Sequence, residues 1–159
     1  MSTKWLSDDE QRAWRAFIET HGDLTTALEH DLAAHGLTLG DYQVLVHLTE
    51  ADDSQMRMCD LADVLQLSPS GLTRRLDGLV SDGHVERLRS PHDGRVMLAA
   101  LTESGRALLE DTAPHHVASV RSVIFDHLTA DEVAAMESIF TKVAQAVAAR
   151  TGDADNPAA

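Results

Sequence analysis

Residues 61–101 read LADVLQLSPSGLTRRLDGLVSDGHVERLRSPHDGRVMLAAL, and this stretch decides the fold. Leucines recur at helical spacing on both sides of Ser68-Pro69. That pair is typical of a helix start, because the hydroxyl caps backbone amides and proline loses no hydrogen bond there. Gly83 ends the helix, and a polar turn at 90–94 separates two segments that read as strands, 84–88 and 96–101. The stretch therefore predicts two short helices and a hairpin, the order of a helix-turn-helix with a wing.

Helical segments flank this stretch on both sides. Periodicity and capping signals predict, in chain order, helices over 8–35 and 38–50, a short edge strand at 56–58, and helices over 59–66, 68–82, 103–127 and 129–149. We expect Pro114 to kink or divide the helix over 103–127. In the last helix, apolar residues alternate spacings of three and four, as in a coiled-coil seam: Val133, Met136, Phe140, Val143 and Val147. The predicted fold class is mainly α (α+β).

Composition fits one compact unit. The 159 residues are 43% hydrophobic and 25% charged, ordinary values for a globular protein with a core. No window is apolar enough to span a membrane, and residues 1–10 do not read as a secretory signal. Cys59 is the only cysteine, so no internal disulfide forms. We therefore expect a cytoplasmic protein with no membrane contact.

Charge is distributed unevenly along the chain. The net charge is −13, which repels polyanions overall. Residues 68–106 hold six basic and five acidic residues, a net +1 that leaves −14 for the rest. The cations available for phosphate contacts are therefore concentrated in and around the predicted wing.

The helix over 68–82 has two contrasting faces. Leu72, Leu76 and Leu79 form an apolar stripe, and the opposite side carries polar groups at helical spacing: Ser70, Thr73, Arg74 and Asp77. Small hydroxyls allow close approach to a DNA major groove, and an arginine binds guanine bidentately. We expect Arg75 to contact a DNA phosphate. Ser68 and Ser70, at the helix start, are also expected to contact phosphate. The alternative is a solvated polar face with no ligand.

The predicted hairpin adds a second set of candidates. Arg95 at its tip suits a narrow minor groove, and Asp93 is placed to bond that guanidinium and fix its direction. Arg87 and Arg89 alternate on one face of the first strand and are expected to contact the DNA backbone. The alternative is an ordinary salt bridge within the turn.

Residues 59–106 resemble the winged helix-turn-helix of the MarR family of bacterial transcriptional regulators. The resemblance rests on these pieces, specific jointly and weak singly: Leu61-Ala62, Leu65, Ser68-Pro69-Ser70, Thr73-Arg74, Leu76, Leu79, Gly83, Val85-Glu86-Arg87, Asp93-Gly94-Arg95 and Leu101-Thr102-Glu103-Ser104-Gly105. The order of the flanking helices extends it to about residues 8–149. One departure is Gly94, where family members often carry a further basic residue, so we expect a less cationic wing.

The resemblance implies a homodimer on a pseudo-palindromic operator in double-stranded DNA. It implies one MarR-like domain over 1–159, with a DNA-binding lobe at 38–102, a helical dimerisation lobe at 8–36 and 103–149, and a disordered tail at 150–159. The long terminal helices would form the interface. Independent support comes from the seam of the last helix and from the face formed by Trp14, Phe17 and Ile18. Either face has an alternative use as intramolecular core.

Similar proteins often bind small phenolic or anionic effectors between the two lobes. The candidates to line such a crevice are Trp14, Arg15, His35 and Tyr42, whose alternative is core packing or solvation. A zinc site would need His30, His35, His115 and His116 to converge, and their spacing is not diagnostic of one, so we expect neither metal nor cofactor. Some relatives use a cysteine as a peroxide sensor, but Cys59 is better interpreted as a buried structural thiol.

No enzyme motif is present in the sequence, so catalysis is not expected. The leading hypothesis is a sequence-specific, dimeric DNA-binding repressor that a small-molecule effector releases. Two alternatives stay open. One is a winged-helix module for protein–protein contact, and the other is a zinc-responsive regulator of the same fold.

Overall fold

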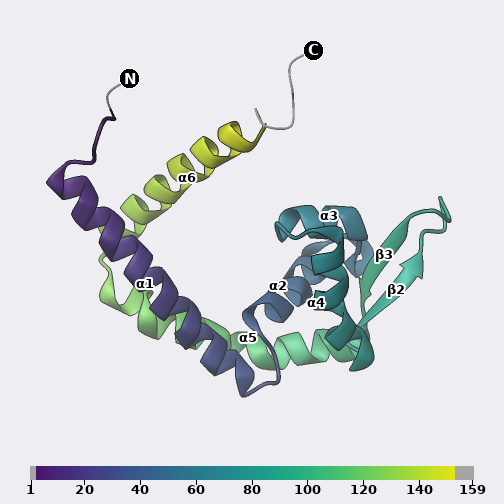
Figure 1. Ribbon diagram of the computed structural model, residues 1–159. Coiled ribbons are helices and arrows are strands. Elements are labelled where there is room, and N and C mark those ends of the chain that lie inside the picture. Colours follow the sequence, from purple (N-terminus) through teal and green to yellow (C-terminus); the bar gives the residue numbers. More distant parts are fainter. Residues whose placement is uncertain (1–2, 153–159) are drawn as a thin grey trace, which may run out of the picture. The chain divides into compact units, whose positions relative to one another are not determined.

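The computed structural model describes residues 3–152 (Figure 1). Its elements, in order, are α1 (Asp8–Ala33), α2 (Leu39–Glu50), η1 (Asp52–Ser54), β1 (Gln55–Arg57), α3 (Met58–Val64), α4 (Pro69–Ser81), β2 (Val85–Arg89), β3 (Met97–Leu101), α5 (Glu103–Val123), η2 (Phe125–His127) and α6 (Ala130–Gly152). This confirms the predicted winged helix-turn-helix order and the mainly helical class. The chain divides into two units after Ser119, within α5.

Side-chain caps explain where three of the helices begin. Ser7 and Thr38 each accept a hydrogen bond from the backbone three residues on, and an acid at that position bonds back, so α1 and α2 both open with a capping box. Ser68 caps α4, with Pro69 in its first turn as predicted. These local signals are what made the helix starts readable from sequence.

The sheet is small and antiparallel, with strand order β1-β3-β2. Val85 pairs with Leu101, and Met56 pairs with Ala99 across the other edge of β3. The short strand near 56–58 is therefore an edge strand, as predicted. The β2–β3 hairpin leaves the tip of the wing at residues 90–96.

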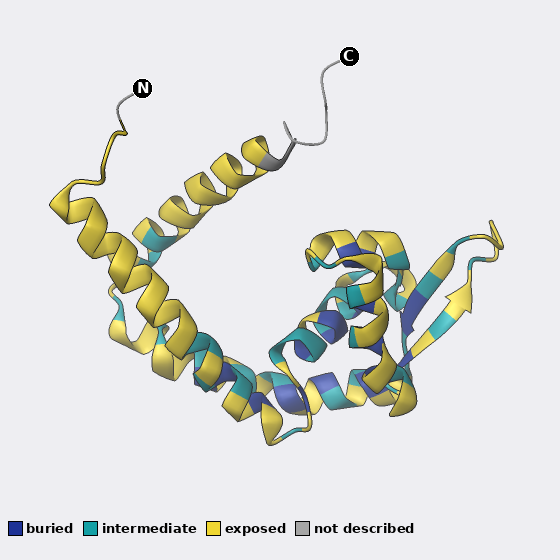
Figure 2. Cartoon of the chain, viewed as in Figure 1, coloured by how far each residue is buried: buried dark blue, intermediate teal, exposed yellow. Residues whose placement is uncertain are grey.

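The hydrophobic core lies in the winged-helix part of the chain (Figure 2). Leu72, Leu76 and Leu79 of α4 are buried, which confirms the predicted stripe. They pack with residues of α2, α3, β2, β3 and α5, among them Val44, Leu45, Leu48, Leu61, Val85, Ala99 and Leu109. Each such side chain contributes about 1.5–3 kcal/mol on burial, so α4 is held firmly from its inner side.

The start of α5 is locked to the turn between α4 and β2. The Thr102 hydroxyl donates to the carbonyl of Gly83 (2.7 Å) and accepts from the amide of Gly105 (3.0 Å). Gly105 allows a close approach, because a Cβ there would lie 2.1 Å from the carbonyl oxygen of His84. These contacts hold the base of the wing, the end of α4 and the start of α5 together.

Two features of local structure differ from what the sequence led us to expect. Of the kink or division expected at Pro114, the division does not occur: α5 runs unbroken from Glu103 to Val123 and ends before the predicted residue 127. Cys59 is exposed rather than buried, and its thiol donates to Asp60 (3.3 Å). Leu61, two residues on, occupies the inner side of α3 and so turns Cys59 outward.

The terminal helices have little burial of their own. Residues 8–23 of α1 are all exposed, and so are residues 137–150 of α6. The predicted tail at 150–159 is helical up to Gly152, and the rest of it lies outside the described residues. Within residues 3–152, no helix is both long enough and apolar enough to cross a membrane.

Candidate nucleic-acid interface

The outer face of α4 is polar, as the sequence predicted. Ser70, Thr73, Arg74 and Asp77 are all exposed, opposite the buried leucines. The hydroxyls near the helix start are engaged locally: Ser68 caps the amide of Gly71 (3.1 Å), and Thr73 donates to the carbonyl of Pro69 (2.9 Å). The face therefore presents short, fixed hydroxyls around one long cation.

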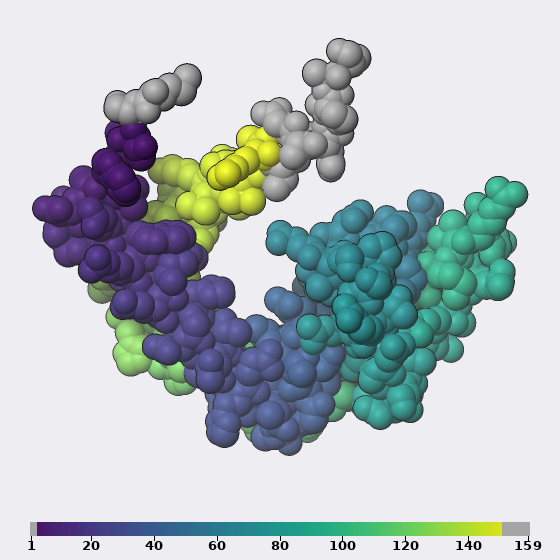
Figure 3. All heavy atoms as spheres, viewed as in Figure 1, coloured from purple at the N-terminus to yellow at the C-terminus, as the bar shows by residue number. Residues whose placement is uncertain are grey.

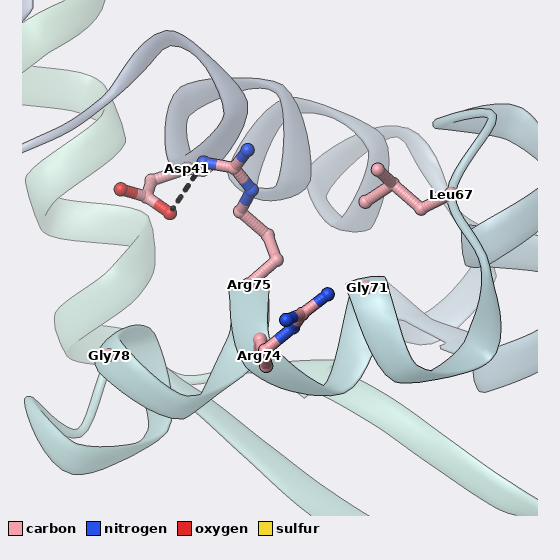
Figure 4. Close-up of a pocket in the computed structure, with 6 residues that line it drawn as sticks. All are labelled: Asp41, Leu67, Gly71, Arg74, Arg75 and Gly78. Atoms are coloured by element: carbon pink, nitrogen blue, oxygen red, sulfur yellow. Dashed lines mark ion pairs between the residues drawn. The ribbon is translucent and has the colours of Figure 1, made fainter.

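That cation is Arg74. It is exposed, and none of the ion pairs found among residues 3–152 includes it. It lines an open hollow of about 510 Å³ together with Asp41, Leu67, Gly71, Arg75 and Gly78 (Figure 4). A guanidinium placed in this way can reach an anionic or hydrogen-bonding partner without first breaking an ion pair.

Arg75 is placed very differently from its neighbour. Its Nη1 donates to Thr38 Oγ1 (2.9 Å) and lies 3.8 Å from Asp41 Oδ1, so it reaches toward α2 (Figure 4). The guanidinium lies over Gly40, where an added Cβ would be 2.4 Å from Cζ. The phosphate contact predicted for Arg75 thus competes with contacts inside the protein.

Arg87 also braces α4. Its Nη2 donates to the carbonyl of Thr73 (2.9 Å) and to Asp77 Oδ1 (2.8 Å), which ties β2 to the reading face. Its Nε is buried without a hydrogen-bond partner. Asp77, expected on the open face, is therefore the partner of a strand arginine. A DNA-backbone contact by Arg87 would have to compete with this pair.

The wing tip is held by its own turn. Asp93 Oδ1 accepts from the backbone amide of Arg95 (3.0 Å) and not from its guanidinium, so the contact that we expected is replaced by a backbone one. Arg89 Nη1 donates to the carbonyl of Gly94 (3.1 Å). Arg95 itself is exposed. Figure 3 shows the hairpin projecting beside the surface of α3 and α4.

The four candidate effector residues are not brought together within the chain. Trp14 and Arg15 line a shallow hollow of about 300 Å³ with Trp5, Leu6 and Gln11. His35 and Tyr42 lie past the other end of α1. Ala33 lies nineteen positions after Trp14 on the same helix, which corresponds to roughly 30 Å at 1.5 Å per residue. One crevice within the chain cannot contain all four.

A partly buried polar cluster lies around Tyr42, and the sequence analysis missed most of its members. We define it as Asp31, Tyr42, Thr112, His116 and Ser119. The rings of Tyr42 and His116 are 4.3 Å apart, and the Ser119 hydroxyl donates to Asp31. Thr112 is fully buried, and its hydroxyl has no hydrogen-bond partner, nor has Nδ1 of His116. Thr112, His116 and Ser119 follow helical spacing on α5, which is the signal that could have found them.

Burial perturbs two acid–base groups in this polar cluster. It lowers the pKa of His116 by disfavouring the imidazolium, an effect that the nearby charge of Asp31 opposes. It also raises the pKa of the Tyr42 hydroxyl. Both groups are therefore held in their neutral forms near pH 7.

The candidate zinc histidines do not converge. His35 stacks near His115, with ring centroids 4.9 Å apart, and its Nδ1 lies 3.6 Å from Asp111 Oδ2. His116 faces Tyr42, and His30 is exposed. Within the described part of the chain, no three His, Cys, Asp or Glu side chains are grouped so that they could hold a metal ion.

Comparison with known proteins agrees with this geometry. A family model described as MarR family matches residues 35–96. The crystal structure of AbsC, a MarR family transcriptional regulator from Streptomyces coelicolor, superposes with a TM-score of 0.87 at 38% identity, covering 91% of this chain and 98% of AbsC. The chain belongs to the MarR family.

Two further relatives bear on the function of the chain. Sco3205, another regulator from Streptomyces coelicolor, was crystallised in complex with DNA; it has a TM-score of 0.87 and 34% identity over 91% of both chains. The transcriptional repressor YetL of Bacillus subtilis is 33% identical over 97 residues, 61% of this chain and 58% of YetL. The chain thus spans less than two thirds of this curated relative.

Proposed function

We propose that this MarR-family chain is a sequence-specific transcriptional regulator that reads a pseudo-palindromic operator with α4. The observation that carries this proposal is the exposed Arg74 on a polar face whose inner side is locked by buried leucines. Arg74 would bond a guanine edge, with Ser70 and Thr73 allowing close approach. The DNA complex of Sco3205 supports the same use of the fold.

The wing would supply a second, weaker contact. Arg95 extends from a turn that Asp93 and Arg89 hold in place, so its exposed guanidinium is free to enter a minor groove. Gly94 contributes no charge at the tip. We therefore expect the wing to add less affinity than α4. Ser68 and Ser70, at the amino end of α4, stay candidates for a phosphate contact.

We propose that the functional unit is a homodimer. Exposed apolar side chains on α1 and on α6 support this: Trp14 and Ile18 on the first, Ile139 and Val143 on the second. Exposed apolar surface on this scale is unusual for a protein that works alone. A dimer also sets two copies of α4 one DNA turn apart, which predicts the operator symmetry.

The regulatory role is proposed to be repression relieved by a small phenolic or anionic effector. The name of YetL, a repressor, supports the first part. The polar cluster supports the second, because the Thr112 hydroxyl and Nδ1 of the half-buried His116 are buried atoms without a hydrogen-bond partner, and such atoms favour a bound polar group. We further propose that the chain catalyses no reaction and acts in the cytoplasm.

The test is DNA binding to the intergenic sequence beside the protein's own gene. We expect footprints over a pseudo-palindrome, and steep loss of binding when one half-site is removed. Arg74→Ala and Arg95→Ala should each weaken binding and reduce the slope of log K against log salt. Arg121→Ala also removes one positive charge, but from an ion pair with Asp126 in the carboxy-terminal unit, and it is the control of equal charge.

Three results would redirect the proposal. If operator affinity and salt slope stay unchanged in Arg74→Ala and Arg95→Ala, α4 and the wing do not read DNA. If the protein gives no specific shift at moderate salt, a protein–protein role with a basic partner becomes the better account of its charge of −13. A melting temperature and DNA affinity that respond to zinc or to a chelator would favour the zinc-responsive alternative.

A further inference from the structure

We propose that Arg75 is a positioning residue: it fixes α4 against the amino end of α2 and does not bind a DNA phosphate. This inference rests on the proposed DNA-binding function and deepens it. Arg74 and Arg75 are neighbours in sequence, and either one reads equally well as a DNA contact. The structure separates their roles.

The hydrogen bond and the ion pair of Arg75 both lie at the amino end of α2. Its Nη1 donates to Thr38 Oγ1 at 2.9 Å, and the same nitrogen is 3.8 Å from Asp41 Oδ1. Thirty-seven residues separate Arg75 from Thr38 in sequence. The contact is therefore tertiary, and it joins the reading helix to a second helix.

The Thr38 hydroxyl makes all the hydrogen bonds that it can make in this arrangement. Its hydroxyl donates to Asp41 Oδ2 (2.6 Å) and accepts from the backbone amide of Asp41 (3.1 Å) as well as from Arg75. A hydroxyl has one proton and two lone pairs, so every position is filled. The Asp41 carboxylate also balances the guanidinium beside the positive end of α2. Moving Arg75 out to a phosphate would undo this network.

Gly40 provides the space for the guanidinium. A Cβ at this position would lie 2.4 Å from Cζ of Arg75, and 2.6 and 2.7 Å from its two Nη atoms. Such distances exclude any side chain while Arg75 stays in place. The glycine is helical, without a positive φ, so close packing and not backbone conformation is what an alanine here would disturb.

Gly40→Ala is therefore a selective variant. The group that it displaces is the far end of a flexible side chain, so the protein can fold with Arg75 moved aside. Alanine is also the better helix former. Every cation of the DNA-facing surface is retained. The variant removes the position of Arg75 and keeps its charge, while Arg75→Ala removes both.

The experiment measures operator affinity across a range of salt concentrations for the full-length protein. We expect Gly40→Ala and Arg75→Ala each to weaken binding by about tenfold, with the same salt slope as the unaltered protein, because no phosphate contact is lost. The double variant should be no weaker than either single variant, since both remove one interaction. Gly22→Ala on α1, where an added Cβ meets nothing within 4 Å, is the matched control.

Two results would overturn the proposal. A phosphate contact predicts that Arg75→Ala lowers the salt slope by about one, while Gly40→Ala binds as well as the unaltered protein or better. A role in stability alone predicts lower melting temperatures with operator affinity unchanged. If the unaltered protein shows no specific binding, the proposed function itself fails and takes this inference with it.

Discussion

The winged-helix part and the terminal helices carry similar apolar side chains but bury them very differently (Figure 2). Leu45 and Leu76 are fully buried, whereas Trp14 of α1 is 55% exposed and Ile139 of α6 is 57% exposed. One chain thus supplies a complete core for the reading helix and leaves the end helices with open apolar faces. The difference indicates that α4 is positioned by its own chain, and it supports the proposal that the end helices meet a second copy.

The largest expected effect comes from charging the open face of α6. Ile139→Glu combined with Val143→Glu should convert dimers to monomers, because each buried apolar side chain contributes about 1.5–3 kcal/mol to an interface. Operator affinity should fall by about 100-fold or more, since each monomer then binds one half-site. Sedimentation and operator titration measure both changes.

The matched control places the same charges on another side of the same helix. Ser138→Glu with Gln145→Glu should leave the dimer intact, since these positions lie well away from Ile139 and Val143 around the helix. If the Ile139/Val143 variant stays dimeric, then α6 does not form the interface. Dimerisation would then not explain why the apolar face of α6 is exposed.

The next effect contrasts one residue from each region. Leu76→Ala should lower the free energy of unfolding by about 3 kcal/mol, because it opens a cavity in a complete core. Val143→Ala should act through association, so its cost should depend on protein concentration. Denaturant titrations at two concentrations separate them. Equal, concentration-independent losses would mean that Val143 belongs to the chain's own core.

The smallest effect is a pH dependence at His116. Because burial lowers its pKa in the folded state, the unfolded chain binds the proton more tightly. His116 therefore costs stability as the pH falls below about 6.5, the usual histidine value. His116→Gln should make the loss of stability between pH 7.5 and 5.5 slightly shallower, since partial exposure screens the effect. His92→Gln, on the exposed wing, is the matched control. If both variants show the same dependence of stability on pH, His116 is not the cause of the effect.

The fold was readable from sequence where local signals decide it. Ser68-Pro69 marked the start of α4, and the spacing of Leu72, Leu76 and Leu79 marked its buried side. Both depend on residues within one or two turns. The same locality failed for α5, where Pro114 read as a break but the helix continues through it.

The partners of the arginines were not readable. The contacts of Arg75 with Thr38 and of Arg87 with Asp77 join residues 37 and 10 positions apart, and nothing local in sequence pairs them. The polar cluster was hidden for the same reason, because His116 meets Tyr42, and Ser119 meets Asp31, only through tertiary packing. Sequence identified which cations are present, and the structure shows which ones are already engaged.

The central claim is that Arg74 reads a base from the outer face of α4. The most direct measurement uses a set of operators in which each G·C pair of one half-site is replaced in turn. The affinity of each operator is measured for the unaltered protein and for Arg74→Ala. We predict that one substitution weakens the unaltered protein by about 10–100-fold and barely affects Arg74→Ala, as expected when one bidentate arginine–guanine contact is lost. If Arg74→Ala discriminates among these operators as the unaltered protein does, Arg74 reads no base.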